Sequence, residues 1–313
     1  MAATQRPIIV NSIKTPPPDD SLPQSPTAVC RSASSARAAW QLRTRELRFD
    51  DTPALMGIVN VTPDSFSDGG DFFTAQKAID HALRLEDAGA DLIDIGGEST
   101  RPYSHSVSSD DELRRVVPVF EALRGRVQCP LSIDSSKSCV ALAAIDLGAE
   151  IINDITGLVG DPQMLRVAVD SGVGVCAMHM RGTPQTMQDA PTYDDVVAEI
   201  HQYLLDRQRA LLDAGMSLAK ICLDPGIGFG KTHAHNLELL RYCDAFLDLG
   251  SPILIGHSRK GFVGKVIGDK DASRDAGTLG FSLALAAKRI HILRVHEVAA
   301  TRQALQCFAA AML

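Results

Sequence analysis

Residues 56–70 read Met-Gly-Ile-Val-Asn-Val-Thr-Pro-Asp-Ser-Phe-Ser-Asp-Gly-Gly, an apolar segment that leads directly into a polar loop. The apolar part, residues 55–61, has the composition of a buried β-strand. Residues 60–68 then supply one amide, three hydroxyls and two carboxylates. Loops at strand ends typically carry the reactive groups of α/β enzymes. The stretch therefore predicts a first strand and a first active-site loop; an ordinary polar turn is the alternative.

The same alternation of strand and helix patterns continues to the end of the chain. Helical spacing is clear in residues 75–88 and 193–214. Eight β/α units in residues 52–313 predict a single (β/α)8 TIM barrel. A doubly wound open sheet is the alternative, but no Gly-x-Gly-x-x-Gly turn follows the first strand. The further apolar strand segments are residues 91–96, 130–134, 151–154, 174–178, 221–224, 253–256 and 290–295.

The bulk properties narrow the class of protein. Residues 1–36 are rich in Pro, Ser and Ala and predict a disordered tail, followed by a barrel domain at 37–313. The net charge of −7 and the absence of a basic stripe argue against a nucleic-acid partner. No apolar segment approaches the ~18 residues that a membrane span needs. Seven scattered cysteines argue against a disulfide framework and predict a reducing, cytoplasmic location.

Polar residues follow all eight predicted strands, at the end where a barrel builds its active site. One polar strand end carries little information, but eight of eight predict an enzyme. The polar positions are Asn60, residues 97–101, Asp134, residues 153–154, 178–179, 224–226, 257–260 and 294–296.

These positions divide into two sets. The first set suits a flat heterocycle with adjacent N–H donors beside a carbonyl, because carboxylates accept hydrogen bonds, lysine donates and an amide does both. The second set comes from strands that become neighbours when the barrel closes, and it suits a phosphate or diphosphate with Mg²⁺ on Asn60. The first set is Asp134, Asn153, Asp224 and Lys260, and the second is Asn60, Arg101, Arg294 and His296.

Eight segments resemble, in order, the motifs of the dihydropteroate synthase family. The resemblance covers the chain from about Trp40 onward and leaves the Pro-rich tail outside. It implies a TIM-barrel transferase of folate biosynthesis that sulfonamides block. Such an enzyme joins 6-hydroxymethyl-7,8-dihydropterin diphosphate to p-aminobenzoate and releases pyrophosphate and 7,8-dihydropteroate. The segments are MGIVNVTPDSFSDGG (56–70), GGESTRP (96–102), SID (132–134), IINDITG (151–157), MHMRG (178–182), DPGIGFGK (224–231), HSRK (257–260) and RVHEV (294–298).

The resemblance also implies roles for individual residues. The first set would hold the pterin, with Asp224 accepting two of its hydrogens. Met178 and Phe229 would pack against the ring, and Arg294 would stack on its other face. The diphosphate would be held by Asn60, Arg294 and His296, with Mg²⁺ bridging it to Asn60, and Thr100 would contact the pterin diphosphate.

The implied chemistry is dissociative. Diphosphate leaves first, and the aromatic amine then captures a dihydropterin cation that Asp134 stabilises electrostatically. Two loops, residues 62–70 and 99–104, would close over the site and exclude water. They would bring Asp68 and Arg101 beside p-aminobenzoate, so that Asp134, Lys260, Asp68 and Arg101 are the implied catalytic residues. The resemblance further implies a homodimer formed through the last helices.

Plainer interpretations stand beside these. Asp134 has the position of a helix N-cap, and Lys260 that of a solvated surface charge. Met178 and Phe229 are residue types more often found in a core. A methyltetrahydrofolate–corrinoid methyltransferase shares the pterin-binding barrel but needs no diphosphate clamp, and a paralogue that binds without turnover is a third possibility. Glu297 departs from the family's usual Asp.

Overall fold

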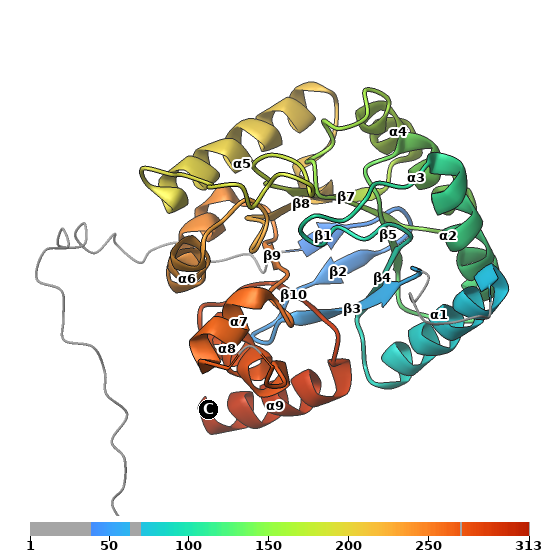
Figure 1. Ribbon diagram of the computed structural model, residues 1–313. Coiled ribbons are helices and arrows are strands. Elements are labelled where there is room, and N and C mark those ends of the chain that lie inside the picture. Colours follow the sequence, from blue (N-terminus) through green and yellow to red (C-terminus); the bar gives the residue numbers. More distant parts are fainter. Residues whose placement is uncertain (1–38, 63–69, 270, 313) are drawn as a thin grey trace, which may run out of the picture. The chain divides into compact units, whose positions relative to one another are not determined.

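The computed structural model describes residues 39–62, 70–269 and 271–312. They belong to a compact unit, Ala36–Leu313, shown in Figure 1. The predicted tail, residues 1–36, lies outside the described residues, so its disorder and its boundary with the barrel stay predictions. Asp68 and most of the first loop also lie outside them.

Eight parallel strands form the centre of this unit. The hydrogen-bonded order is β8-β7-β6-β5-β4-β3-β10-β9, and a bridge between Leu223 and Ile253 joins β8 to β9 and closes the ring. The predicted TIM barrel is confirmed, and the doubly wound sheet is wrong. The strands are β3 (Ala54–Asn60), β4 (Leu92–Gly96), β5 (Leu131–Asp134), β6 (Ile151–Asp154), β7 (Gly174–Met178), β8 (Ile221–Asp224), β9 (Leu254–Ile255) and β10 (Ile292–Val295).

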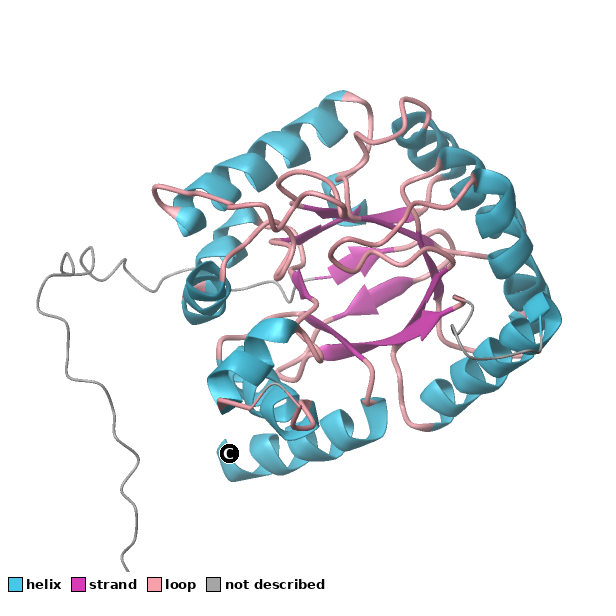
Figure 2. Cartoon of the chain, viewed as in Figure 1, coloured by secondary structure: helices cyan, strands magenta, loops and turns pink. Residues whose placement is uncertain are grey.

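Helices surround the strands, as Figure 2 shows. Every residue of β4 and β7 is buried, which explains why these strands are so apolar in sequence. The helices are α1 (Gly70–Asp87), α2 (Ser109–Leu123), α3 (Ser138–Asp146), α4 (Met164–Ser171), α5 (Val196–Asp213), α6 (His233–Arg241), α7 (Gly261–Ile267), α8 (Asp275–Ala287) and α9 (Val298–Met312), with 3-10 turns at Leu218–Lys220 and Cys243–Leu249.

Helix α5 illustrates how the local sequence determines where a helix begins, which face it buries and where it ends. The side chain of Asp195 accepts hydrogen bonds from the backbone N–H groups of Val197 and Ala198, at 3.1 and 2.9 Å, and so caps the helix start. Buried residues such as Ile200 and Leu204 then recur at helical spacing and face the barrel. The helix ends ahead of Gly215, whose φ of +99° is accessible to glycine. Among the described residues, none of the helices combines the length and the apolar character that crossing a membrane requires.

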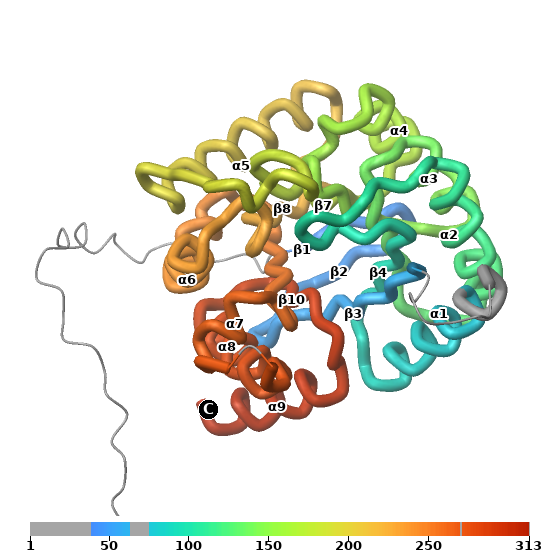
Figure 3. Tube along the Cα trace, in the orientation of Figure 1, coloured from blue at the N-terminus to red at the C-terminus, as the bar shows by residue number. Residues whose placement is uncertain are grey.

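A feature absent from the sequence prediction is a hairpin, β1 (Ala39–Gln41) and β2 (Glu46–Arg48), that packs across one end of the barrel. Trp40 is fully buried, and its Nε1 donates to the backbone oxygen of Lys220, just before β8, at 3.0 Å. Figure 3 shows the hairpin trace crossing the ring of strands. The hairpin therefore closes the N-terminal end of the barrel. Its apolar residues Trp40, Leu42 and Phe49 form one buried cluster with Met56, Leu92, Ile151, Cys176, Cys222, Leu254 and Ile292.

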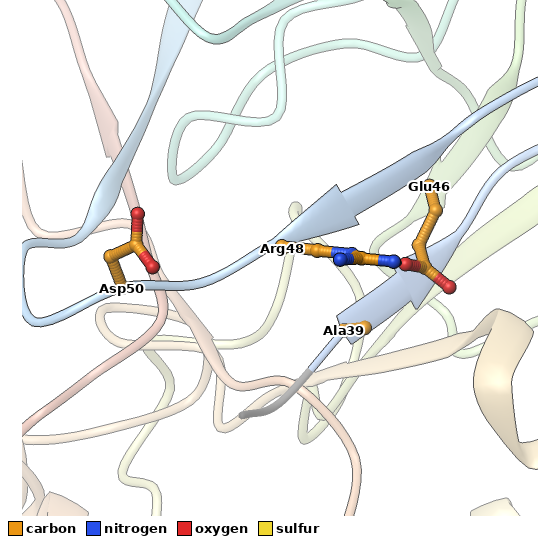
Figure 4. A pocket seen from close by; sticks show the side chains of 4 residues that line it. All are labelled: Ala39, Glu46, Arg48 and Asp50. Carbon is orange, nitrogen blue, oxygen red and sulfur yellow. The ribbon is translucent and has the colours of Figure 1, made fainter. Parts of the chain in front are cut away.

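A hollow of about 420 Å³ lies beside this hairpin, lined by Ala39, Glu46, Arg48 and Asp50 (Figure 4). Glu46 and Arg48 pair with each other there at 2.7 Å. Because the hairpin packs on the first residues of the strands, the hollow is at the opposite end of the barrel from the polar strand exits. It is therefore not the candidate site.

Candidate active site

The centre of the site is an arginine held between two carboxylates. The Nε atom of Arg294, on β10, lies 2.6 Å from Asp94 Oδ2, and its Nη2 atom lies 2.7 Å from Asp134 Oδ2. Asp94 is on β4 and Asp134 ends β5. Closure of the barrel joins these residues, because Arg294 and Asp94 are 200 positions apart in the chain. Gly96 makes space for the side chain of Asp134, because a Cβ at position 96 would lie 3.3 Å from the Asp134 Cβ.

Burial changes the acid–base properties of this cluster. It raises the pKa of Asp134 to about 7, although the guanidinium of Arg294 acts in the opposite direction. Burial alone would lower the pKa of Arg294, but the carboxylates of Asp94 and Asp134 outweigh it and the pKa is raised. Arg294 is therefore a permanent cation, whereas Asp134 titrates near neutral pH.

Two further polar side chains lie on neighbouring strands. Asn153, on β6, donates through Nδ2 to Asp94 Oδ2 at 2.9 Å. Asp224, at the end of β8, accepts a hydrogen bond from the backbone N–H of Gly226 at 2.7 Å, and burial raises its pKa. In the described part of the chain Asp94 Oδ1 is buried without a hydrogen-bond partner. Such an atom is an acceptor that a bound N–H donor would satisfy.

Lys260 faces these acidic groups from the start of α7. Burial lowers the pKa of Lys260 to about 8, while Asp224 acts to raise it. Its Nζ atom bonds the backbone oxygen of Ile227 and lies 4.4 Å from the centroid of the Phe229 ring. Lys260 is thus a half-buried part of the cluster, and its interpretation as a solvated surface charge is wrong.

The glycine-rich loop after β8 packs its backbone against the end of β7. Gly226 has a φ of +69°, and a Cβ there would lie 1.9 Å from the backbone oxygen of His179. Lys231 joins the same two segments, because its Nζ atom lies 2.9 Å from His179 Nδ1 and 2.8 Å from the Phe229 oxygen. This loop therefore uses its glycines for close packing, and Gly226 lies against the side chain of the buried Met178.

The second predicted set consists of Asn60, Arg101, Arg294 and His296, which lie on or after β3, β4 and β10. His296 Nδ1 lies 2.9 Å from Ser258 Oγ. Burial, together with the positive charges of Arg259, Arg294 and Arg101, lowers the pKa of His296 to about 4. The imidazole is consequently neutral at pH 7, within the electrostatic reach of three arginines. Such a group of hydrogen-bonding and cationic side chains suits an anionic ligand.

Asn60 is exposed at the end of β3. Its amide oxygen fits Mg²⁺, a hard cation that commonly takes one or two protein oxygens and completes its shell with water and phosphate. The described residues contain no group of three His, Cys, Asp or Glu side chains arranged to hold a metal. Asn60 therefore suits a cation that arrives with an anionic substrate rather than a metal bound by protein groups alone.

Residues 56–296 match the family model described as pterin binding enzyme. The chain belongs to this family. The dihydropteroate synthase of Escherichia coli (strain K12) is 44% identical over 254 residues, which are 81% of this chain and 90% of that protein. A structure of the Xanthomonas albilineans dihydropteroate synthase with 4-aminobenzoic acid matches with a TM-score of 0.81 and 44% identity over 88% of this chain and 98% of that one. The same enzyme in complex with 7,8-dihydropteroate matches with a TM-score of 0.78 and 42% identity over the same shares.

For this pterin-binding enzyme, most of the residues predicted from sequence lie at one end of the barrel. Asp134 is not a helix cap, since its carboxylate bonds Arg294 and Lys137 is the N-cap of α3. Thr100 is half-buried and Arg101 exposed in the loop after β4, and Asp68 lies outside the described residues. The individual ligand contacts of all these residues stay predictions.

The sequence interpretation missed Asp94, and it gave no role to Ser258, which it included only as part of the polar strand end at 257–260. Asp94 is a charged residue inside an otherwise apolar strand, and a fully buried carboxylate in such a place is rare without a partner or a function. That interruption of the apolar pattern was the available signal. Ser258 carries no such signal, because a serine after a strand is typical of many turns.

Proposed function

We propose that this protein is a dihydropteroate synthase, which condenses 6-hydroxymethyl-7,8-dihydropterin diphosphate with p-aminobenzoate to give 7,8-dihydropteroate and pyrophosphate. One observation carries the proposal. The buried polar cluster of Asp94, Asp134, Asn153, Asp224 and Arg294 lies at the strand exits of a barrel that is 44% identical to a named synthase. The cluster has the acceptors and donors that a pterin ring requires.

The pterin ring fits the first set of residues. We infer that Asp224 accepts the hydrogens of the 2-amino group and N3, while Lys260 donates to a ring acceptor. Asn153 and Asp94 lie within one hydrogen-bonded group and present a further acceptor, the unpartnered Asp94 Oδ1. Met178 and Phe229 lie in adjacent segments and supply apolar contacts for a flat ring.

The diphosphate fits the second set. Arg294 and the neutral His296 would donate hydrogen bonds to phosphate oxygens, with Arg101 and Thr100 on the neighbouring loop. Asn60 would hold a Mg²⁺ ion that the diphosphate brings, and the ion would supply charge neutralisation to the leaving group. A methyltetrahydrofolate–corrinoid methyltransferase has no need for this second set, which favours the synthase.

The proposed reaction begins with cleavage of the bond between the pterin methylene carbon and the diphosphate oxygen. The bonding electrons leave with diphosphate, and a dihydropterin cation remains. The ionised carboxylate of Asp134 stabilises that cation. The amine lone pair of p-aminobenzoate then forms the new C–N bond, and the amine loses a proton. Exclusion of water by the two loops prevents hydrolysis of the cation.

The test is pyrophosphate release from dihydropterin diphosphate and Mg²⁺, measured with and without p-aminobenzoate. We expect release coupled to dihydropteroate formation. Tight pterin binding without coupled release would favour a non-catalytic paralogue, and the absence of pterin binding would overturn the proposal. Omission of Mg²⁺ in the same assay tests the role of Asn60.

We further propose that the enzyme is a homodimer in the cytoplasm. Exposed apolar side chains on the last helices support the dimer, namely Val266 and Ile267 on α7 and Met312 on α9. In the described part of the chain Cys129, Cys139, Cys176, Cys222, Cys243 and Cys307 are all free, which supports a reducing compartment. Light scattering of the purified protein tests the dimer.

A further inference from the structure

A second buried ion cluster lies beside the candidate site. The Nζ atom of Lys137 bonds a carboxylate oxygen of Glu98 and lies 2.5 Å from Glu112 Oε2. The side chains of Lys137 and Glu98 are 21% and 19% exposed, and that of Glu112 is fully buried. This cluster contains one cation and two carboxylates, and it is separate from the group around Arg294.

The three residues come from three different parts of the barrel, and Glu112 lies on α2. Glu98 is the second residue of the loop after β4, two positions before Thr100 and three before Arg101. Lys137 lies three positions after Asp134 and is the N-cap of α3. Lys137 therefore connects the segment that carries Asp134 to the loop that carries Arg101.

Other contacts fix both ends of this loop. At its base, a Cβ on Gly97 would lie 2.8 Å from a side-chain carbon of Val116, and Arg115 donates to the Gly97 oxygen at 2.7 Å. At its tip, the Tyr103 N–H donates to the backbone oxygen of Pro184 at 2.9 Å. Arg101 thus lies between two points of attachment, and the ion pair at Glu98 is the charged contact nearest to it on the base side.

Stability is a poor explanation for such a cluster. Removing two carboxylates and an ammonium from water is costly, and buried ion groups are often no more stable than apolar replacements. Glu112 Oε1 also has no hydrogen-bond partner among the described residues, which adds to the cost. The cluster does fix the positions of the segments that carry its residues, because each buried charge must stay beside its partner.

We propose that Lys137 and Glu98 are positioning residues that hold the Thr100–Arg101 loop at a defined distance from Asp134. The inference rests on the proposed function, because it takes Asp134 as the group that stabilises the cation. The pterin ring is held by strand residues and not by this loop. Loss of the ion pair therefore lowers turnover while the pterin ring still binds.

The experiment compares Glu98→Gln with Glu150→Gln, a control at the other end of the barrel. Glu150 is also a buried carboxylate in an ion pair, 2.8 Å from the exposed Arg45, but its side-chain contacts are with the hairpin. We expect Glu98→Gln to lower kcat by on the order of ten- to a hundredfold, as for displaced catalytic groups, with the dissociation constant of 6-hydroxymethyl-7,8-dihydropterin, the ligand without its diphosphate, close to that of wild type. Glu150→Gln should lower the melting temperature and leave both constants unchanged.

Lys137 gives a second, independent variant. Lys137→Gln combined with Glu98→Gln should lower kcat no more than the more damaging single change, because both remove the same interaction. Unchanged kcat in Glu98→Gln, or a fall of kcat and pterin affinity in parallel with the melting temperature, would overturn the positioning role. Wild-type protein in the same assay tests the proposed function separately. If wild type makes no dihydropteroate, the proposed function itself fails, whatever the variants do.

Discussion

The two ends of this barrel differ in the kind of side chain that they bury: apolar at one end and charged at the other. The N-terminal end is closed by an apolar hairpin whose Trp40 is fully buried. The C-terminal end places Asp94, Asp134 and Arg294 in a buried ion group and carries the proposed reaction. The difference shows a division of roles: the hairpin end is packed for stability, whereas the other end keeps charged side chains buried at a cost in stability and uses them for the proposed reaction. The following changes test that division.

The largest effect is expected at the hairpin end. Trp40→Ala removes a fully buried indole and leaves a cavity, so the free energy of unfolding should fall by about 3–5 kcal/mol. Urea unfolding measures this change. Leu142→Ala, at a position that is 47% exposed, should change the same quantity by less than ~0.5 kcal/mol. The molecules of Trp40→Ala that remain folded should keep the wild-type kcat, and a lower kcat in them would contradict the division.

The next effect is expected at the exit end. Asp134→Asn removes the charge proposed to stabilise the cation, so turnover should fall by at least about a hundredfold. The variant should still fold, because Arg294 keeps Asp94 as a partner. Steady-state rates and circular dichroism check the two statements. Asp146→Asn, an exposed position on α3, is the matched control, and near-normal turnover in Asp134→Asn would remove Asp134 from the mechanism.

The pH dependence of turnover should show a bell-shaped profile. Asp134 must be ionised, and because burial raises its pKa to about 7, the rate should rise as the pH increases through 7. Lys260 must be protonated, and because burial lowers its pKa to about 8, the rate should fall above pH 8. On each limb the rate should change about tenfold per pH unit. A profile of kcat/KM for p-aminobenzoate without an acid limb near pH 7 would contradict the assignment of Asp134.

The smallest effect is expected from the tail. Deletion of residues 2–36 leaves the hairpin and the barrel intact, so kcat and both KM values should stay those of the full-length protein. Steady-state kinetics of the shortened protein provide the measurement. A large rise in either KM, or insolubility, would show that the tail contributes to one of the two ends.

Much of the barrel was predictable because strands and helices leave periodic patterns in the sequence. The predicted strand at 151–154 coincides with β6, and the predicted helix at 193–214 contains α5. The hairpin was not predictable in this way. Its strands have three residues each, which is too short for a pattern, and they owe their stability to the barrel that they close.

The candidate site was predictable as a list of residues but not as a set of contacts. Motif order and polar strand ends marked Asp134, Asn153, Asp224 and Lys260. Glu297, a departure from the family's usual Asp, turned out to pair with Arg259 at 2.6 Å. Nothing in the local sequence indicated that Lys137 would join Glu98 to Glu112, since the three lie on separate elements.

By itself the sequence determined the element types, the barrel and the family, because hydrophobic periodicity and strand-end chemistry are local properties. Tertiary structure alone decided that Arg294 lies between Asp94 and Asp134, because the last strand β10 pairs with the first barrel strand β3, next to β4, only in the folded barrel. It also decided the charge of Asp134 near neutral pH, since a pKa depends on how deeply a group is buried and on which charges surround it.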